Sequence, residues 1–185
     1  MSIVTRTGDT GMTGLMYNRR VPKHHPRVAA YGSVDEFNAA LGLARATTAH
    51  TFVAENIFSI QKDLVVLMGE LCVLPEDLPR YLADGYSQVT PAMTAKLEAL
   101  VRDIELQSIR FDGWATPGGD PNSAALDLAR TVCRRAERNV CALNDAGEKV
   151  NPEIVIFLNR LSDLLWLFAR WVETKRGEAP GPKRN

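Results

Sequence analysis

The 185-residue sequence has no excess of either charge, because its 22 lysines and arginines are matched by 22 aspartates and glutamates. Proteins that bind nucleic acid or membrane surfaces usually show a strong basic excess, so this balance argues against both classes. The sequence also lacks an apolar run near the roughly 18 residues that a membrane-spanning helix needs, and its first residues lack the apolar core of a secretory signal. We expect neither nucleic acid nor a membrane as a partner.

Cysteine is scarce, and its spacing argues against a cysteine metal site. Cys72, Cys133 and Cys141 form no C-x-x-C pair, and each lies within or at the end of an apolar helical pattern. An odd number of thiols in such positions is typical of buried, reduced cysteines in a cytosol-like compartment. We therefore expect a cytoplasmic protein.

Histidine is equally scarce, and only His24, His25 and His50 are present. A ferritin-like di-metal centre needs Glu-x-x-His pairs, and none of the three histidines belongs to one. Catalysis by a serine or cysteine nucleophile is also unsupported, because no helical histidine is available as its base. Both chemistries are set aside.

Apolar residues recur every three or four positions in five segments, which is the pattern of amphipathic helices. These segments cover residues 33–44, 53–71, 90–104, 120–143 and 151–172. The first begins with a capping box, Ser33-Val34-Asp35-Glu36. Five helices with short to moderate connections and no strand alternation predict an all-α five-helix bundle with ferritin-like, up-down topology.

The chain fits one domain over residues 1–175, with an N-terminal loop in residues 1–30 and a disordered tail at 176–185. Residues 73–89 are too long and mixed for a tight turn, and they predict a surface excursion without an assigned role. The connector 111–119 contains two aromatic residues and three glycines. Its aromatics either close the end of the bundle or cover a ligand.

The segment from Asp120 carries the densest cluster of arginines on a predicted helix. Asp120 can cap the helix with Pro121 at the first helical position, and a stripe of alanines and valines follows. Arg130 and Arg134 lie beside this stripe, so we expect at least two guanidinium groups to be half-buried. A half-buried arginine needs an anion, either a carboxylate of the fold or the phosphate of a ligand.

Residues 5–14 (TRTGDTGMTG) have no helical period and are rich in threonine and glycine. Free backbone N–H groups and hydroxyls at this density are the material of an anion-binding nest. The segment is not a Walker A loop, because no lysine follows Gly14. A polar hairpin or a flexible arm is the plain alternative.

The last predicted helix places Asn159 and Asp163 one turn apart at the margin of its apolar stripe. Such a pair either binds a neighbouring arginine or contacts a ligand. An interhelical salt bridge of Asp163 is at least as good an interpretation as a direct role in ligand binding.

Four segments together resemble the propanediol-utilisation type of ATP:cob(I)alamin (corrinoid) adenosyltransferases. They are residues 5–11 (TRTGDTG), 31–38 (YGSVDEFN), 133–138 (CRRAER, with Arg130 before it) and 158–163 (LNRLSD). Each motif is weak alone, but their order and spacing make the set specific, and the resemblance covers roughly residues 3–172.

The resemblance implies a homotrimer of five-helix bundles that binds ATP between neighbouring subunits. It also implies an ion pair between Asp35 and Arg130 across the subunit boundary, which shapes the corrinoid side. Trp114 stands where members carry an aromatic residue, usually phenylalanine, that closes the lower face of the corrin. The ATP-binding positions that it implies are Thr5, Arg6, Thr7, Gly8, Thr13, Gly14, Lys23, Arg134, Arg135, Glu137, Arg138 and Asn159.

The implied reaction transfers the 5′-deoxyadenosyl group of ATP to Co(I) of a reduced corrinoid and releases triphosphate. Arg134, Lys23 and Mg²⁺ would stabilise charge on the leaving triphosphate, although the sequence identifies no ligands for Mg²⁺. The further partners implied are a flavin reductase and an adenosylcobalamin-dependent acceptor enzyme. Two other hypotheses stay open: a non-catalytic ATP or corrinoid sensor or carrier, and a structural bundle whose arginines pair with its own acids.

Overall fold

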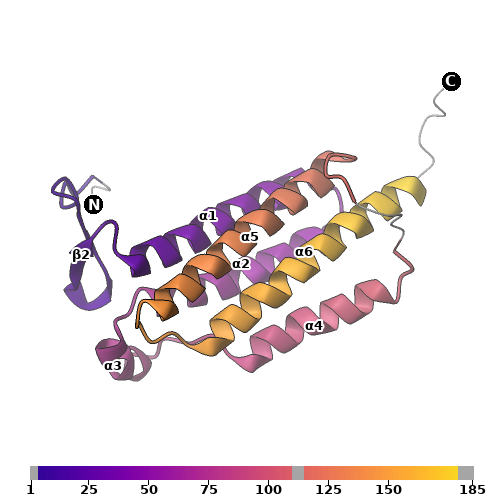
Figure 1. Cartoon of the computed structure of the whole chain (residues 1–185). Helices are drawn as coiled ribbons and strands as arrows, with labels where there is room; N and C mark the ends of the chain where they lie inside the picture. Colours follow the sequence, from indigo (N-terminus) through magenta and orange to yellow (C-terminus); the bar gives the residue numbers. More distant parts are fainter. Residues whose placement is uncertain (1–3, 110–114, 179–185) are drawn as a thin grey trace.

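The computed structural model describes residues 4–109 and 115–178 of the chain (Figure 1). A short antiparallel hairpin of strands β1 (Met12–Gly14) and β2 (Arg20–Pro22) precedes the helices. The α-helices are α1 (Pro26–Thr47), α2 (Thr51–Leu71), α3 (Leu78–Ala83), α4 (Pro91–Glu105), α5 (Pro121–Asp145) and α6 (Pro152–Glu178). The predicted all-α class is confirmed, while the predicted count of five omitted the short helix α3.

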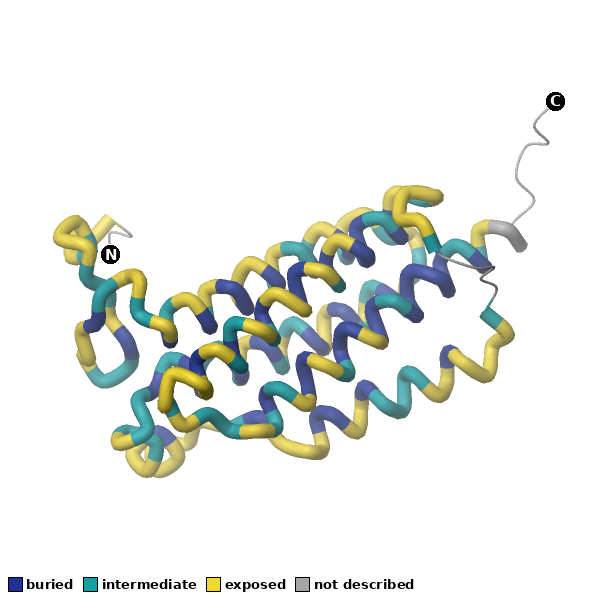
Figure 2. Tube along the Cα trace, viewed as in Figure 1, coloured by how far each residue is buried: buried dark blue, intermediate teal, exposed yellow. Residues whose placement is uncertain are grey.

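Five long helices lie side by side, with α5 packed against both α1 and α6 (Figure 1). Helix α6 also contacts α4, and α1 contacts α2. Figure 2 shows that the buried positions of each long helix gather on its inward side. Phe37 of α1 and Phe168 of α6 are fully buried in this core. None of the helices in the described ranges is long and apolar enough to span a lipid bilayer.

Helix α5 begins where the sequence predicts it. The Asp120 carboxylate accepts hydrogen bonds from the backbone N–H groups of Asn122 at 2.8 Å and Ser123 at 3.2 Å, which satisfies two otherwise free donors. Ala129 and Ala136 are fully buried, and their small side chains let α5 approach its neighbours closely. The predicted alanine and valine stripe is therefore the buried face of this helix.

The predicted start of the first helix is wrong. Helix α1 begins at Pro26, and the Nδ1 atom of its N-cap, His25, accepts from the Arg27 N–H at 3.1 Å. Ser33 is buried within the helix and donates its hydroxyl to the Ala30 carbonyl at 2.7 Å. A serine inside a helix can bond back to the preceding turn, so the capping-box pattern does not by itself mark a helix start.

The excursion at residues 73–89 contains more structure than the sequence predicts. A 3₁₀ turn (Pro75–Asp77) leads into α3, and Tyr81 of α3 is buried and stacks on Tyr86 with 4.8 Å between ring centroids.

At the other end of the chain, α6 continues to Glu178 and so includes the first three residues of the predicted tail.

Candidate functional site

The threonine- and glycine-rich segment forms a compact loop ahead of β1. The Thr5 and Thr7 hydroxyl oxygens lie 3.0 Å apart, and the Thr7 carbonyl accepts from Arg20 Nη2 at 2.6 Å. Thr5 and Thr7 are exposed, so the two neighbouring hydroxyls remain open to a ligand. Of the two plain alternatives for this segment, the hairpin is the one observed.

Two glycines of this loop, Gly8 and Gly11, lie where a side chain would be unfavourable. A Cβ atom at Gly8 would lie 3.1 Å from the Lys23 ammonium nitrogen, and the Lys23 N–H donates to the Gly11 carbonyl at 2.8 Å. Gly11 has φ = 78°, in the left-handed region that glycine adopts without strain. The loop therefore folds back over β2 and holds a lysine beside its backbone. Thr13 and Gly14 belong to β1 and pair with Val21 and Arg20 of β2.

The hairpin is fastened to the 3₁₀ turn and α3. Arg19 donates from Nε and Nη2 to the Asp77 carboxylate at 2.7 and 2.9 Å, a bidentate ion pair. The Tyr17 hydroxyl donates to Asp84 Oδ2 at 2.8 Å, and the Met16 N–H donates to the Cys72 carbonyl at 3.0 Å. These bonds fix the loop relative to the helical bundle.

Helix α5 exposes several cations along the face predicted to bind an anion. Arg134 and Arg138 make no hydrogen bond or ion pair with any residue that the structure describes, and Lys23 and Arg6 also lack an acidic partner there. Arg135 is paired with Glu36 of α1. The expectation of two half-buried guanidinium groups on α5 is wrong for Arg134, which is exposed in a single chain.

Asn159 and Glu137 connect α6 to this face of α5. The Asn159 amide donates to Glu137 Oε1 at 3.1 Å. Glu137 lies about one helical turn after Arg134 and immediately before Arg138. The Asp163 carboxylate accepts from Arg160 of the same helix at 3.4 Å, and among the described residues it forms no salt bridge to another helix. Two cations and a fixed amide thus line one exposed strip of the molecule.

Arg130 is held differently from the other arginines of α5. Its Nε donates to Asp127 Oδ1 at 3.1 Å, and Asp127 Oδ2 accepts from Arg170 Nη2 at 2.7 Å. Asp127 and Arg170 are 3% and 1% exposed. Burial alone lowers the pKa of Arg170, but its hydrogen bonds to Glu173 and Asp127 raise it above the ordinary value. The sequence does not reveal this buried pair, because no local pattern links positions on two different helices.

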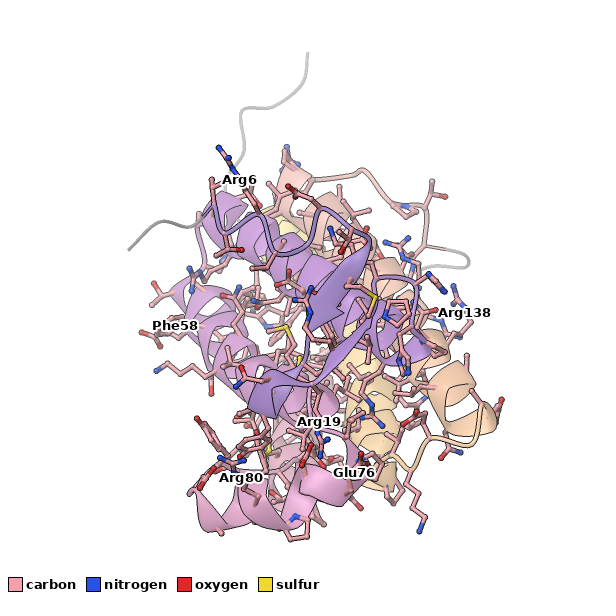
Figure 3. All side chains as sticks on the ribbon, turned by 90° about the vertical axis from the view of Figure 1, so that its left-hand side faces the viewer. Arg6, Arg19, Phe58, Glu76, Arg80 and Arg138 are labelled. Atoms are coloured by element: carbon pink, nitrogen blue, oxygen red, sulfur yellow. The ribbon has the colours of Figure 1, made fainter. Side chains whose placement is uncertain are left out.

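The predicted site residues do not all meet within one chain. Looking onto the end of the bundle that carries the hairpin, Figure 3 shows Arg6 and Arg138 on different sides of the molecule. Asp35 is exposed and makes no ion pair with Arg130 of its own chain. Trp114 lies outside the described residues. We therefore treat the loop that carries Arg6 and the segment of α5 that carries Arg138 as the two halves of a candidate site.

Taken together, these observations define a mostly helical protein whose helix α5 exposes cations without an acidic partner among the described residues. The sequence profile of the cobalamin adenosyltransferases matches residues 3–172, and the chain belongs to that family. The family resemblance of the four motifs is therefore confirmed.

Relatives of this family align over most of the chain. A cobalamin adenosyltransferase of Cupriavidus metallidurans is 37% identical over 169 residues, which cover 91% of this chain and 86% of the relative. A corrinoid adenosyltransferase of Mycobacterium leprae is 36% identical, with 93% and 91% covered. The corrinoid adenosyltransferase PduO of Salmonella typhimurium is 36% identical, and the chain spans about half of it, since 92% of this chain matches 49% of that protein.

Solved structures show the same fold. A phenylalanine-to-alanine variant of the PduO-type ATP:corrinoid adenosyltransferase from Lactobacillus reuteri, complexed with cobalamin and ATP, superimposes with a TM-score of 0.84 at 30% identity. The alignment covers 95% of this chain and 96% of that one. An arginine-to-lysine variant of the same enzyme, complexed with ATP, gives a TM-score of 0.82.

Proposed function

We propose that this protein transfers the 5′-deoxyadenosyl group of ATP to Co(I) of a reduced corrinoid, forming adenosylcobalamin and releasing triphosphate. Its family membership and the activity named for its relatives support this function. The observation that carries the proposal is the strip of unpaired cations on α5, next to an amide fixed by Glu137. Guanidinium groups without an internal anion are suited to bidentate binding of phosphate oxygens.

The bonds of the proposed reaction balance without a base from the protein. The electron pair of Co(I) forms the cobalt–carbon bond, the bond between the ribose 5′ carbon and its oxygen breaks, and that electron pair leaves with triphosphate. The chain therefore needs to position both substrates and to stabilise the leaving charge. Arg134 and Lys23 are the residues that we assign to the leaving triphosphate.

No thiol of this chain is suited to act as a nucleophile in place of cobalt. Burial raises the pKa of the Cys133 thiol far above its ordinary value, and its Sγ donates to the Leu158 carbonyl at 3.4 Å. Burial also raises the pKa of Cys72 to about 11. Burial is also the main cause that raises the pKa of the Cys141 thiol. All three thiols therefore stay protonated at neutral pH, which leaves the corrinoid as the nucleophile.

We place Mg²⁺ on the triphosphate. In nucleotide sites this ion is held mainly by phosphate oxygens and water, with few protein ligands. The adjacent hydroxyls of Thr5 and Thr7 are hard oxygen donors of the type that the ion accepts, so the loop fits it. When bound, Mg²⁺ would neutralise charge that develops on the leaving group.

We further propose that the site forms between subunits of a homotrimer of helical bundles. The separation of Arg6 and Arg138 in Figure 3 supports this arrangement, because the loop of one chain would meet the α5 cations of the next. Arg130 would pair with Asp35 of the partner subunit beside the corrinoid. The three free cysteines agree with a cytoplasmic location, where a flavin reductase and an adenosylcobalamin-dependent enzyme would act before and after this step.

The deciding experiment mixes the purified protein with ATP, Mg²⁺ and chemically reduced cobalamin and follows formation of the cobalt–carbon bond optically. We expect adenosylcobalamin and triphosphate in equal amounts. ATP binding without product would instead support a sensor or carrier. Absence of ATP binding would exclude every ligand-binding interpretation of the α5 face.

A further inference from the structure

A buried ionic network connects the core of the bundle to Arg130. Asp127 lies between two arginines, with Oδ2 bonded to the buried Arg170 at 2.7 Å and Oδ1 bonded to Arg130 at 3.1 Å. Arg170 is also bound by Glu173, through Nε at 2.8 Å and Nη2 at 2.9 Å. The network therefore contains two cations and two anions.

Asp127 is not needed to neutralise Arg170, because Glu173 already binds that guanidinium through two hydrogen bonds. Burying a second carboxylate carries a desolvation cost that an ion pair often fails to recover. Stability alone is thus a weak reason for placing Asp127 here. The remaining partner of Asp127 is Arg130, whose side chain is 26% exposed.

The geometry leaves the outer part of Arg130 available. Its Nε points to Asp127, and its two terminal nitrogens have no hydrogen-bond partner within residues 4–109 and 115–178. An unrestrained arginine side chain populates many rotamers, so anchoring Nε removes much of that freedom before any partner arrives. The guanidinium is held at its inner edge while its outer edge stays open.

We propose that Asp127, anchored by Arg170, is a positioning residue that orients Arg130 toward Asp35 of the partner subunit. The inference rests on the proposed function, because it assigns Arg130 to the corrinoid side of an intersubunit site. Asp127 touches neither substrate in this arrangement. It acts through Arg130 by fixing the direction in which that guanidinium meets the neighbouring chain.

The test compares Asp127→Asn with Glu173→Gln, which removes the other carboxylate of Arg170 and leaves Arg130 anchored. We expect Asp127→Asn to lower kcat/KM for the reduced corrinoid between about tenfold and a hundredfold, because misplaced groups lose that much. The affinity for ATP should stay within about twofold. Glu173→Gln should lower the melting temperature about as much as Asp127→Asn does, but its kcat/KM should stay within about twofold of the wild-type value. Equal losses of kcat/KM in both variants would overturn the proposal.

A double-mutant cycle shows whether Asp127 acts through the intersubunit pair. Asp127→Asn combined with Asp35→Asn should lose no more than Asp35→Asn alone, whereas independent effects would multiply and overturn the inference. If the wild-type protein makes no adenosylcobalamin, the proposed function fails. The double-mutant cycle then uses a different measurement, the protein concentration at which the oligomer of each variant dissociates. Additive effects there, or a monomeric wild-type protein, would reject the role of Asp127.

Arg130→Lys keeps the test decisive if Asp127→Asn does not fold. The three donors of a lysine ammonium sit on one nitrogen, so lysine cannot reproduce the separated Nε and Nη donors with which arginine would face Asp127 and Asp35. We expect this variant to lose as much kcat/KM as Asp35→Asn. Activity near that of the wild type would overturn the proposal.

Discussion

Arg134 differs from the neighbouring arginines because no acid in the described chain neutralises it. Arg130 is bound by Asp127 and Arg135 by Glu36, while Arg134 is exposed and unpaired. The spacing of residues in α5 does not decide whether the anion that binds Arg134 is a carboxylate of this chain or a phosphate of a ligand. The structure removes the carboxylate among the described residues, so the ligand is the better candidate.

Replacing Arg134 tests this assignment. We expect Arg134→Ala to weaken ATP binding or turnover by about 1.5 to 3 kcal/mol, which is roughly 10- to 150-fold, because a hydrogen bond to a charged group is lost. Arg134→Lys should recover only part of the loss, since lysine lacks the planar fork. The measurements are ATP titration calorimetry and kcat/KM. Arg102→Ala, which removes an exposed cation from α4, is the matched control, and an equal loss there would point to a general charge effect.

The thiols should differ in reactivity according to burial. Thiol pKa values raised by burial keep the protonated, unreactive form dominant at neutral pH. For Cys72, with a pKa of about 11, the thiolate fraction and the alkylation rate should rise about tenfold per pH unit until that pH is reached. Cys133 should stay unmodified until the protein unfolds. Peptide mapping after iodoacetamide treatment at several pH values checks both expectations, and rapid labelling of native Cys133 would contradict them.

At the scale of elements, residues 73–89, to which the sequence assigns no role, support the hairpin and the threonine- and glycine-rich loop of residues 5–14. The 3₁₀ turn and α3 receive the hairpin through Asp77 and Asp84. Tyr17 and Asn18 both have φ = 58°, a conformation unfavourable for residues with a side chain, so the hairpin turn depends on such outside contacts. The position of the hairpin therefore depends on Asp77 and Asp84, which lie 58 and 67 residues after their partners in the sequence.

Asp77→Asn should release this support. We expect KM for ATP to rise about three- to tenfold with little change in kcat, because the loop must then be ordered on binding. The control is Asp103→Asn, which neutralises an acid of α4 whose carboxylate has no ion pair among the described residues. A changed kcat with unchanged KM would contradict a role in loop placement.

The same ion pair has a defined pH dependence. The hydrogen bond from Arg19 lowers the pKa of Asp77 below its ordinary value, so the carboxylate stays charged where a free aspartate begins to protonate. Because the folded-state pKa is lowered, the contribution of this pair is present above the unfolded pKa and is lost as the pH falls through the folded value. KM for ATP in the wild type should therefore rise only in that more acidic range.

The sequence predicts features that depend on neighbouring residues better than features that depend on packing between helices. Apolar spacing and the Asp120-Pro121 signal predicted α5 correctly, because both depend on neighbours within the same helix. The capping-box pattern at Ser33 wrongly predicted a helix start, because Ser33 lies inside α1 and its hydroxyl donates to the Ala30 carbonyl of the same helix. The Asp127–Arg170 pair joins residues 43 positions apart, and only the packing of α5 on α6 brings them together. Three-residue strands such as β1 are too short for an alternating pattern to reveal.

At the scale of the whole molecule, one chain carries both halves of the candidate site without joining them. The loop holds Lys23 beside Gly8, and α5 holds Arg134, while Figure 3 shows Arg6 and Arg138 apart. A ligand that needs both halves requires either a large rearrangement or a second copy of the chain. The buried faces of the long helices argue against rearrangement, because moving them would expose the core.

Mixed oligomers separate these two possibilities. Lys23→Ala damages the loop half and Arg134→Ala the α5 half, so we expect each variant alone to retain at most about a tenth of the wild-type activity. Consider oligomers formed from equal amounts of the two variants, with each site built from the loop of one chain and the α5 of its neighbour. The loop is intact in half of the sites and α5 in half, so about one quarter of randomly formed sites have both halves intact. Co-refolded mixtures should therefore regain about a quarter of wild-type kcat. A site contained within one chain would regain nothing, because every chain carries one lesion, and native mass spectrometry of the mixture establishes that mixed oligomers have formed.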